Sequence, residues 1–293
     1  MVSDSPGLSS AAVSPPPRPI PVCLSIAGSD SGGGAGIQAD LKAFARAGVH
    51  GTTAITAITA QNTVGVVGVE AISPAMIVAQ VRAVVEDIGV DAVKIGMLGS
   101  VASAEAVAEA LDLMPAGTPV VVDPVMVAES GARLLDRDAQ AALVNLVVAR
   151  ATVVTPNLPE ARVLAGDDAL DGEALARAVR ALGPEAVVVT GGHREQAIDV
   201  LFDGEHVVEL AGERYPDGAA HGSGCTHSSA LAAHLALGFA LVESARAARA
   251  IAAEAVRYGL RDLGAGPGPV NVLGVGYGDV HAVANTGRLG TPA

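Results

Sequence analysis

A short glycine-rich segment in front of a predicted helix is the sharpest chemical feature of the chain. The run His221-Gly222-Ser223-Gly224-Cys225-Thr226 opens a helix predicted over Thr226–Leu237. A helix start leaves backbone N–H groups free and carries the positive end of the helix dipole, and small residues let an anion approach the backbone. We therefore expect Gly222–Cys225 to form an oxyanion cradle for a phosphoryl group in transfer. The alternative is a glycine-rich linker with an ordinary Ser or Thr cap.

Cys225 carries a potential nucleophile or base at this helix start. A thiol at a helix N-terminus is expected to have a lowered pKa, because the dipole favours the thiolate. The alternative is a buried structural thiol.

Two acids, Asp123 and Glu160, follow two different predicted strands. Carboxylates, together with phosphate oxygens and water, are how Mg²⁺ is usually held in proteins. The pair therefore predicts a Mg²⁺ site for a nucleotide-dependent reaction. The alternative is a turn acid and a solvated helix-start Glu, and the sequence does not show whether the two side chains meet.

The elements that would position these residues alternate between short β-branched runs and Ala/Leu/Val-rich helical stretches, which predicts βαβ units and a mainly parallel sheet. Predicted strands cover Pro21–Ala27, Thr52–Thr59, Ala92–Ile95, Pro119–Val122, Thr152–Thr155 and Ala186–Val189. Predicted helices cover Ile37–Ala47, Pro74–Asp87, Val101–Leu113, Arg137–Ala149, Gly172–Leu182, Thr226–Leu237 and Leu241–Leu263. Asp203-Gly204, between the apolar runs Ile198–Phe202 and His206–Leu210, predicts an antiparallel hairpin at the sheet edge.

Polar and glycine-rich turns follow every predicted parallel strand. In open α/β sheets, ligands bind in the crevice beyond the carboxyl ends of the strands. Turns are often rich in Gly, Asn and Asp for structural reasons alone, but six such turns at one edge favour a ligand site. They begin at Gly28, Ala60, Gly96, Asp123, Pro156 and Gly191.

Composition excludes several classes of partner. The 293 residues include 18 basic and 31 acidic side chains, a net charge of −13, which argues against nucleic acid and anionic membranes. No apolar run reaches the roughly 20 residues of a transmembrane helix. With Cys23 and Cys225 as its two cysteines, the chain can form at most one disulfide, and we expect it in the reducing cytoplasm.

The ends of the chain differ in composition from its middle. Residues 1–19 are rich in Ser and Pro and lack the features of a signal peptide, so a disordered tail is predicted. Residues 274–293 are Gly-rich and aperiodic and are predicted to lie outside the fold. A single domain is therefore expected over residues 20–273.

The first glycine cluster fits neither the dinucleotide-binding G-x-G-x-x-G pattern nor a P-loop. In combination with the later motifs, however, it resembles the hydroxymethylpyrimidine/phosphomethylpyrimidine kinases of thiamine biosynthesis, in the ribokinase-like superfamily. The matching motifs stand in family order across about Pro21 to Leu273. They lie at Ala27–Lys42, Thr59–Thr63, Lys94–Leu98, Asp123–Met126, Thr155–Glu160, Gly191–His193 and Gly222–Thr226.

This resemblance implies a three-layer α/β/α fold and two successive ATP-dependent phosphorylations of 4-amino-5-hydroxymethyl-2-methylpyrimidine. It places Cys225 where the wider superfamily has a catalytic Asp, and it implies Mg²⁺ and a homodimer. The substrate-binding residues it implies are Gln61, which would hydrogen-bond the pyrimidine, with Asp40, Gly28, Met97 and Val125 nearby. The nucleotide-binding residues it implies are Asn157, Thr190, Gly192, His193 and Arg194.

Two positions depart from the family pattern near the expected nucleotide phosphates. Thr190 stands where the family usually has Lys, and Ala219-Ala220 stand where it usually has a polar residue and Thr. Either the positive charge has moved to Arg194, or ATP binding is weakened. Three functions stay open: the pyrimidine kinase, a pyridoxal or pyridoxine kinase of the same fold, and a non-catalytic vitamin-precursor binder.

Overall fold

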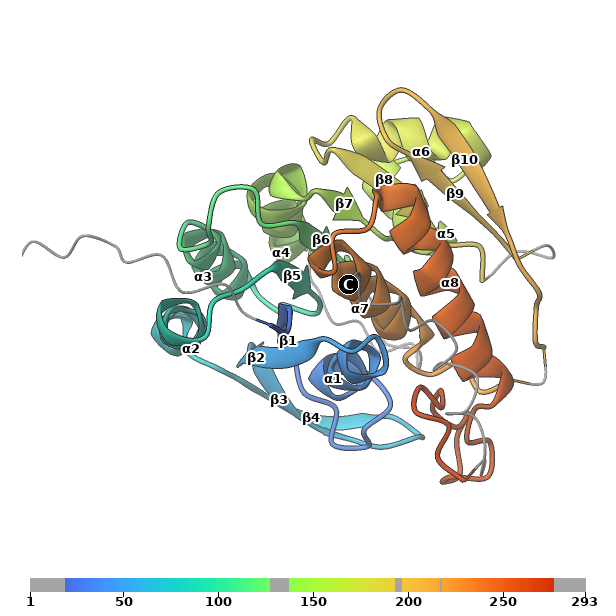
Figure 1. Ribbon diagram of the computed structural model, residues 1–293, viewed down its shortest axis with the longest axis horizontal. Coiled ribbons are helices and arrows are strands. Elements are labelled where there is room, and N and C mark those ends of the chain that lie inside the picture. Colours follow the sequence, from blue (N-terminus) through green and yellow to red (C-terminus); the bar gives the residue numbers. More distant parts are fainter. Residues whose placement is uncertain (1–18, 127–136, 193–196, 217, 277–293) are drawn as a thin grey trace, which may run out of the picture.

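A central sheet of eight strands organises the molecule (Figure 1). The computed structural model describes residues 19–126, 137–192, 197–216 and 218–276. Six neighbouring strands run parallel, and two further strands pair antiparallel at one edge. In spatial order the strands are β10 (Val207–Ala211), β9 (Ile198–Phe202), β8 (Ala186–Val189), β7 (Val153–Val154), β6 (Val120–Val122), β5 (Ala92–Ile95), β1 (Val22–Ala27) and β2 (His50–Ile55).

Helices cover both faces of this sheet, so the predicted three-layer α/β/α fold is confirmed. One core lies between the sheet and α2 (Pro74–Asp87), α3 (Val101–Leu111), α4 (Arg137–Ala142), α5 (Leu158–Ala165) and α6 (Gly172–Arg180). The other lies beneath α1 (Gly36–Arg46), α7 (Ser223–Ala236) and α8 (Leu241–Arg257).

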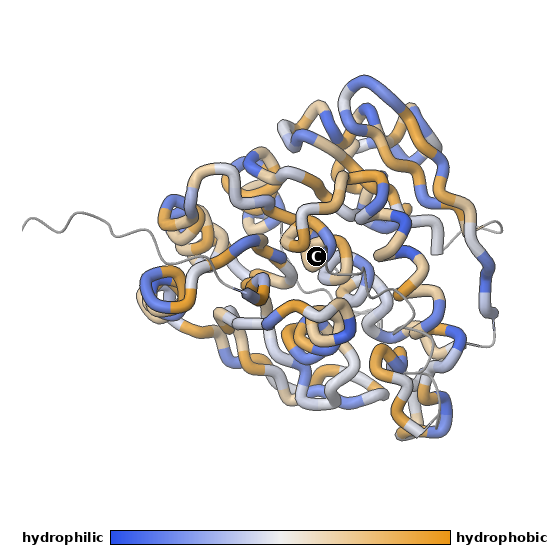
Figure 2. Tube along the Cα trace, viewed as in Figure 1, coloured by the Kyte–Doolittle hydropathy of each residue, from blue (hydrophilic) through white to orange (hydrophobic). Residues whose placement is uncertain are grey.

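Side chains that alternate along each strand contribute to the two cores in turn. In β1, Leu24 and Ile26 belong to the first core and Cys23 to the second; in β6, Val122 belongs to the first and Val121 to the second. Successive side chains of a strand point to opposite faces, so a strand covered on both faces is apolar along most of its length. Figure 2 shows the resulting apolar centre of the fold.

The prediction of one strand over Thr52–Thr59 is wrong. The segment forms β2 and then β3 (Ala57–Gln61), which leaves the main sheet and pairs antiparallel with β4 (Val66–Ala71). The break falls at Thr56, whose backbone N–H donates to the carbonyl of Ala27 and whose hydroxyl donates to the carbonyl of Met97 at 2.8 Å. The unbroken run of β-branched residues and Ala over Thr52–Thr59 gave no sign of this change of partner.

Other boundaries differ for local reasons. Helix α5 was not predicted, because it has only eight residues. The helix predicted over Arg137–Ala149 is α4 followed by a π-helical turn, Leu143–Val147, and a 3₁₀ turn, Val148–Arg150. The predicted tails fall almost wholly outside the described residues. Among the helices that are described, none has the length and apolar character needed to cross a membrane.

Candidate active site

Two glycine-rich loops meet at the carboxyl ends of the central strands. Gly222, directly before α7, has φ +87°, and a Cβ there would lie 1.7 Å from the carbonyl oxygen of Gly34. Only glycine satisfies both the left-handed backbone and this close approach. The start of α7 is therefore packed directly on the loop that follows β1.

Asp30 holds the first loop in shape. Its carboxylate accepts hydrogen bonds from the N–H groups of Gly32, Gly34 and Ala35 at 2.8, 3.0 and 2.8 Å. It also lies 3.1 Å from Nε2 of His221. Burial alone would raise the pKa of Asp30, but the bonds from His221 and the loop amides lower it below its usual value. A charged carboxylate thus ties the two loops together.

A cavity of about 790 Å³ opens against the two loops. One end is lined by four of the five predicted substrate residues, Gly28, Gln61, Met97 and Val125. The side-chain amide oxygen of Gln61 lies 3.3 Å from the hydroxyl of Thr59, which donates to it. Among the described residues, the amide NH₂ group of Gln61 has no hydrogen-bond partner, so it can donate to a ligand.

Asp40, the fifth predicted substrate residue, is placed differently. It is fully buried and is not among the residues that line the cavity. Its carboxylate accepts from the hydroxyls of Ser25 and Ser229, at 2.6 and 2.7 Å, and from the ammonium group of Lys94. Lys94, in contrast, lines the cavity. Of this ion pair, the lysine therefore presents its positive charge to a ligand.

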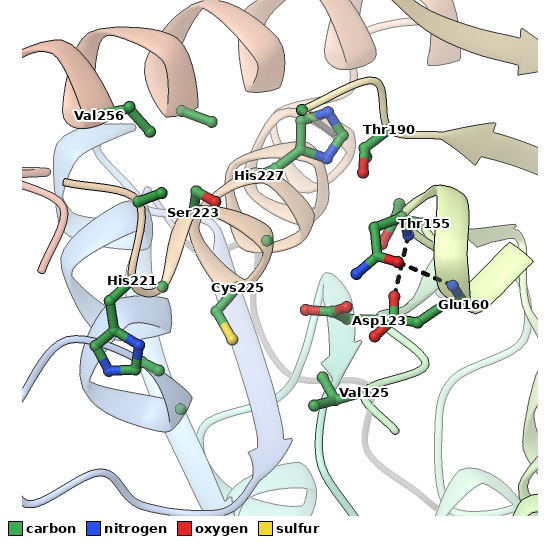
Figure 3. Close-up of a pocket in the computed structure, with 18 of the residues that line it drawn as sticks. Asp123, Val125, Thr155, Glu160, Thr190, His221, Ser223, Cys225, His227 and Val256 are labelled. Atoms are coloured by element: carbon green, nitrogen blue, oxygen red, sulfur yellow. Dashed lines mark hydrogen bonds between the residues drawn. The ribbon is translucent and has the colours of Figure 1, made fainter. Parts of the chain in front are cut away.

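The predicted cradle residues Gly222–Cys225 all line the cavity. Figure 3 shows the sulfur of Cys225 directed into it from the start of α7. The prediction of a lowered pKa for Cys225 is wrong: burial, the largest influence, raises it to about 12, and the neighbouring positive charge of Lys94 only partly opposes this. Desolvation of a thiolate outweighs the helix dipole here.

Asp123 and Glu160 do meet. Both line the cavity, and Figure 3 shows their carboxylates close together. Burial, the larger influence, and the charge of Asp123 together raise the pKa of Glu160 to about 8. Burial likewise raises the pKa of Asp123, against the opposing charge of Lys94.

A capping box orients Glu160. Its carboxylate accepts from the backbone N–H of Asn157 at 3.0 Å, and its own N–H donates to the Asn157 side chain at 2.9 Å. Two buried acids that repel each other suit a divalent cation. Within the described residues no third His, Cys, Asp or Glu completes a metal-binding cluster, which is normal for Mg²⁺ held partly by substrate phosphates.

The far end of the cavity contains the predicted nucleotide residues that the structure describes. Asn157, Thr190 and Gly192 line it. His193 and Arg194, also predicted to bind nucleotide, lie outside the described residues. Of the residues that depart from the family pattern, Ala220 lines the cavity and Ala219 is buried.

Comparisons with known proteins identify the family to which the chain is similar. A sequence profile of the family described as phosphomethylpyrimidine kinase matches residues 30–271. The hydroxymethylpyrimidine/phosphomethylpyrimidine kinase of Rhizobium meliloti (strain 1021) is 48% identical over 258 residues, which are 85% of this chain and 96% of the relative.

Solved structures of two vitamin kinases have a similar fold. An ADP complex of Bacillus subtilis pyridoxal kinase has a TM-score of 0.78 at 39% identity, over 86% of this chain and 97% of that one. The phosphomethylpyrimidine kinase of Clostridium difficile 630 has a TM-score of 0.71 at 39% identity, over 80% and 99%. The fold and the site thus define a small-molecule kinase of the ribokinase-like class. Within that class, the chain belongs to the phosphomethylpyrimidine kinase family.

Several residues of the site were not predicted from the sequence: Asp30, Lys94, Asp199, His227 and Arg249. Lys94 had a usable signal, because it is one of only two lysines in the chain and interrupts an apolar strand. A charge in a strand buried on both faces needs a partner or a function. The other four are ordinary polar residues until the fold brings them together.

Proposed function

We propose that the chain phosphorylates 4-amino-5-hydroxymethyl-2-methylpyrimidine, and then its monophosphate, with ATP, in thiamine biosynthesis. One observation carries the proposal: a single cavity runs from Gln61 to Thr190, with the glycine-rich start of α7 between them. A flat alcohol at one end and a nucleotide at the other would meet at Cys225.

The roles of the residues follow from their positions. The Gln61 amide would bind the pyrimidine, because an amide both donates to and accepts from a ring that carries an amino group and ring nitrogens. The start of α7 and the ammonium group of Lys94 would stabilise negative charge on the transferring phosphoryl group. Cys225, as a neutral thiol, would position the substrate hydroxyl rather than act as a strong base, which phosphoryl transfer does not require.

Mg²⁺ fits the acidic pair. Asp123 and Glu160 would hold it, and when bound it would neutralise charge on the nucleotide phosphates. Asn157, which fixes one oxygen of Glu160, would keep that carboxylate oriented.

The test is to incubate the protein with ATP, Mg²⁺ and each candidate alcohol and to weigh the products by mass spectrometry. We expect two successive phosphate additions to the pyrimidine. The 39% identity to the pyridoxal kinase of Bacillus subtilis makes pyridoxal the second candidate, and faster turnover of pyridoxal would make it the substrate instead. A protein that binds the pyrimidine without forming product would be a non-catalytic binder.

We also propose that the chain forms a homodimer, as the family resemblance implies, and that the β3–β4 ribbon is the interface. The ribbon stands apart from the main sheet and exposes apolar side chains, Ile58, Val64, Val67 and Val69, which are 45–84% exposed. Apolar residues gathered on a projecting ribbon favour association. Sedimentation equilibrium should give a dimer that Val67→Glu converts to a monomer, and a monomeric parent protein would refute the assignment.

A further inference from the structure

A buried polar cluster joins three elements at the nucleotide end of the cavity. Asp199, on β9, accepts hydrogen bonds from the N–H of Gly191 at 2.7 Å and from the guanidinium of Arg249, on α8, at 2.5 Å. Nε2 of His227, on α7, lies 3.6 Å from the other carboxylate oxygen of Asp199. All three side chains line the cavity.

Asp199 is the centre of this cluster. Burial alone would raise its pKa, but the imidazole of His227, the guanidinium of Arg249 and the Gly191 N–H together lower it below its usual value. Gly191 packs directly against the backbone of β9, because a Cβ there would lie 2.0 Å from the carbonyl oxygen of Ile198. Asp199 therefore fixes the backbone between Thr190 and Gly192, which both line the cavity.

His227 is the member of this cluster whose buried ring lacks hydrogen bonds. Its side chain is 6% exposed, and neither of its ring nitrogens has a hydrogen-bond partner among the described residues. Figure 3 shows the ring directed from α7 toward Thr190. A separation of 3.6 Å is too long for a hydrogen bond, so the attraction to Asp199 only partly offsets the free energy of burying the ring. Unsatisfied buried polar groups are few in folded proteins and mark functional positions.

We propose that His227 is a positioning residue for the nucleotide: acting through Asp199, it holds the Thr190–Gly192 loop at a fixed distance from the start of α7. The proposal rests on the proposed function only in taking this end of the cavity as the nucleotide end. His227 follows Cys225 by two residues on the same helix, so one rigid element sets both the reaction centre and the loop. Arg249 supplies the second support for Asp199 from α8.

A packing role and a positioning role of His227 predict different effects of the same substitution. If His227 were only a packing residue, Leu in its place would remove two unsatisfied nitrogens and leave nucleotide binding unchanged, with equal or greater stability. If it positions the loop, His227→Leu weakens nucleotide binding without lowering Tm. Gln can donate to Asp199 from a position close to that of Nε2, so His227→Gln should rescue binding.

The experiment measures ADP binding by calorimetry, Tm, and the KM for ATP and for the alcohol in both variants. We expect His227→Leu to raise the Kd for ADP and the KM for ATP about tenfold, with the KM for the alcohol changed less than about twofold and Tm not lowered. His234→Leu is the matched control: this second histidine of α7 bonds the carbonyl of Ala230 at 2.7 Å and does not line the cavity.

Several results would overturn the proposal. They are an unchanged Kd for ADP in His227→Leu, equal losses for ADP and the alcohol, or a His227→Gln variant that behaves like Leu. If Leu prevents folding, a His227→Gln variant whose Kd for ADP is within about threefold of the parent's supports the proposal, and a larger loss refutes it. ADP binding needs no alcohol, so a parent protein that binds ADP but ignores the pyrimidine refutes the proposed substrate and not this role.

Discussion

The ammonium group of Lys94 lies 2.9 and 3.1 Å from the two carboxylate oxygens of Asp40, and both side chains are fully buried. Burial alone would lower the pKa of Lys94, but the negative charge of Asp40, which also accepts its hydrogen bonds, raises it above its ordinary value. The lysine is therefore cationic at the floor of the cavity. Asp40 acts on the site through this charge and not by touching the cavity itself.

Substitutions in the Lys94–Asp40 ion pair should affect stability and kcat differently. Lys94→Met leaves the Asp40 carboxylate buried without its cation and should cost about 3–5 kcal/mol of unfolding free energy, measured by urea denaturation. The double variant Asp40→Asn/Lys94→Met removes both charges and should regain most of that stability. Its kcat should stay low, because the cation at the cavity floor is still missing. Recovery of both properties would make the pair purely structural.

An exposed ion pair provides the control. Arg177 and Glu173 lie 2.6 Å apart on the surface of α6, with both side chains about half exposed. Removing this pair should cost less than about 1 kcal/mol. It should leave kcat unchanged.

Gln61→Leu tests recognition of the substrate ring. Loss of the amide leaves polar atoms of the bound ring unpaired, a cost of about 1–3 kcal/mol, or roughly 5- to 150-fold in the KM for the pyrimidine. The KM for ATP should not change, since Gln61 ends β3, directly after edge strand β2, whereas Thr190 follows β8 toward the other edge of the sheet. A rise in the KM for ATP instead would contradict the placement of the two substrates.

The raised pKa of Cys225 gives two measurable results. Iodoacetamide should alkylate it more slowly than a free cysteine at neutral pH, because only the thiolate reacts. Cys225→Ala should lower kcat with little change in either KM, since the group would interact mainly in the transition state. Rapid alkylation, or an unchanged kcat, would remove Cys225 from the reaction centre.

The pattern of strands and helices predicted the mainly parallel sheet, because strand and helix periodicities differ clearly where strands are buried on both faces, whereas the three-layer arrangement was implied by the family resemblance. The four strands before the hairpin, from Ala92 to Val189, were placed within about one residue. The β3–β4 ribbon was missed because nothing in the run Thr52–Thr59 shows that its second half leaves the sheet. That change is made by the contacts of Thr56 with Ala27 and Met97.

The site was predicted in part for a similar reason. Glycine turns and acids at strand ends are local signals, and Gly222, Asp123 and Glu160 could be found from them. Whether Cys225 is charged, or Asp40 faces a ligand, depends on what surrounds each group in space. Asp199, His227 and Arg249 are up to 50 residues apart in the chain, so no local pattern connects them.

The raised pKa of Glu160 predicts that the stability of the protein, and its stabilisation by Mg²⁺, depend on pH. Its pKa rises from the ordinary 4.5 to about 8 on folding, so the folded chain binds this proton more tightly than the unfolded chain. Between those values, ionisation in the unfolded state makes stability fall as pH rises. Glu160→Gln should remove this decline.

A cation beside Asp123 favours the ionised form of Glu160 and offsets the repulsion between the two acids. With ADP present, Mg²⁺ should therefore raise Tm more at the alkaline end of the window between pH 4.5 and about 8 than at its acid end. The measurement is a series of thermal melts across that window, with and without Mg²⁺. Glu160→Gln should reduce both the Mg²⁺ effect and its pH dependence, whereas Glu209→Gln, an exposed change on β10, should alter neither. A Mg²⁺ effect that is equally large at every pH and in both variants would place the metal away from Glu160.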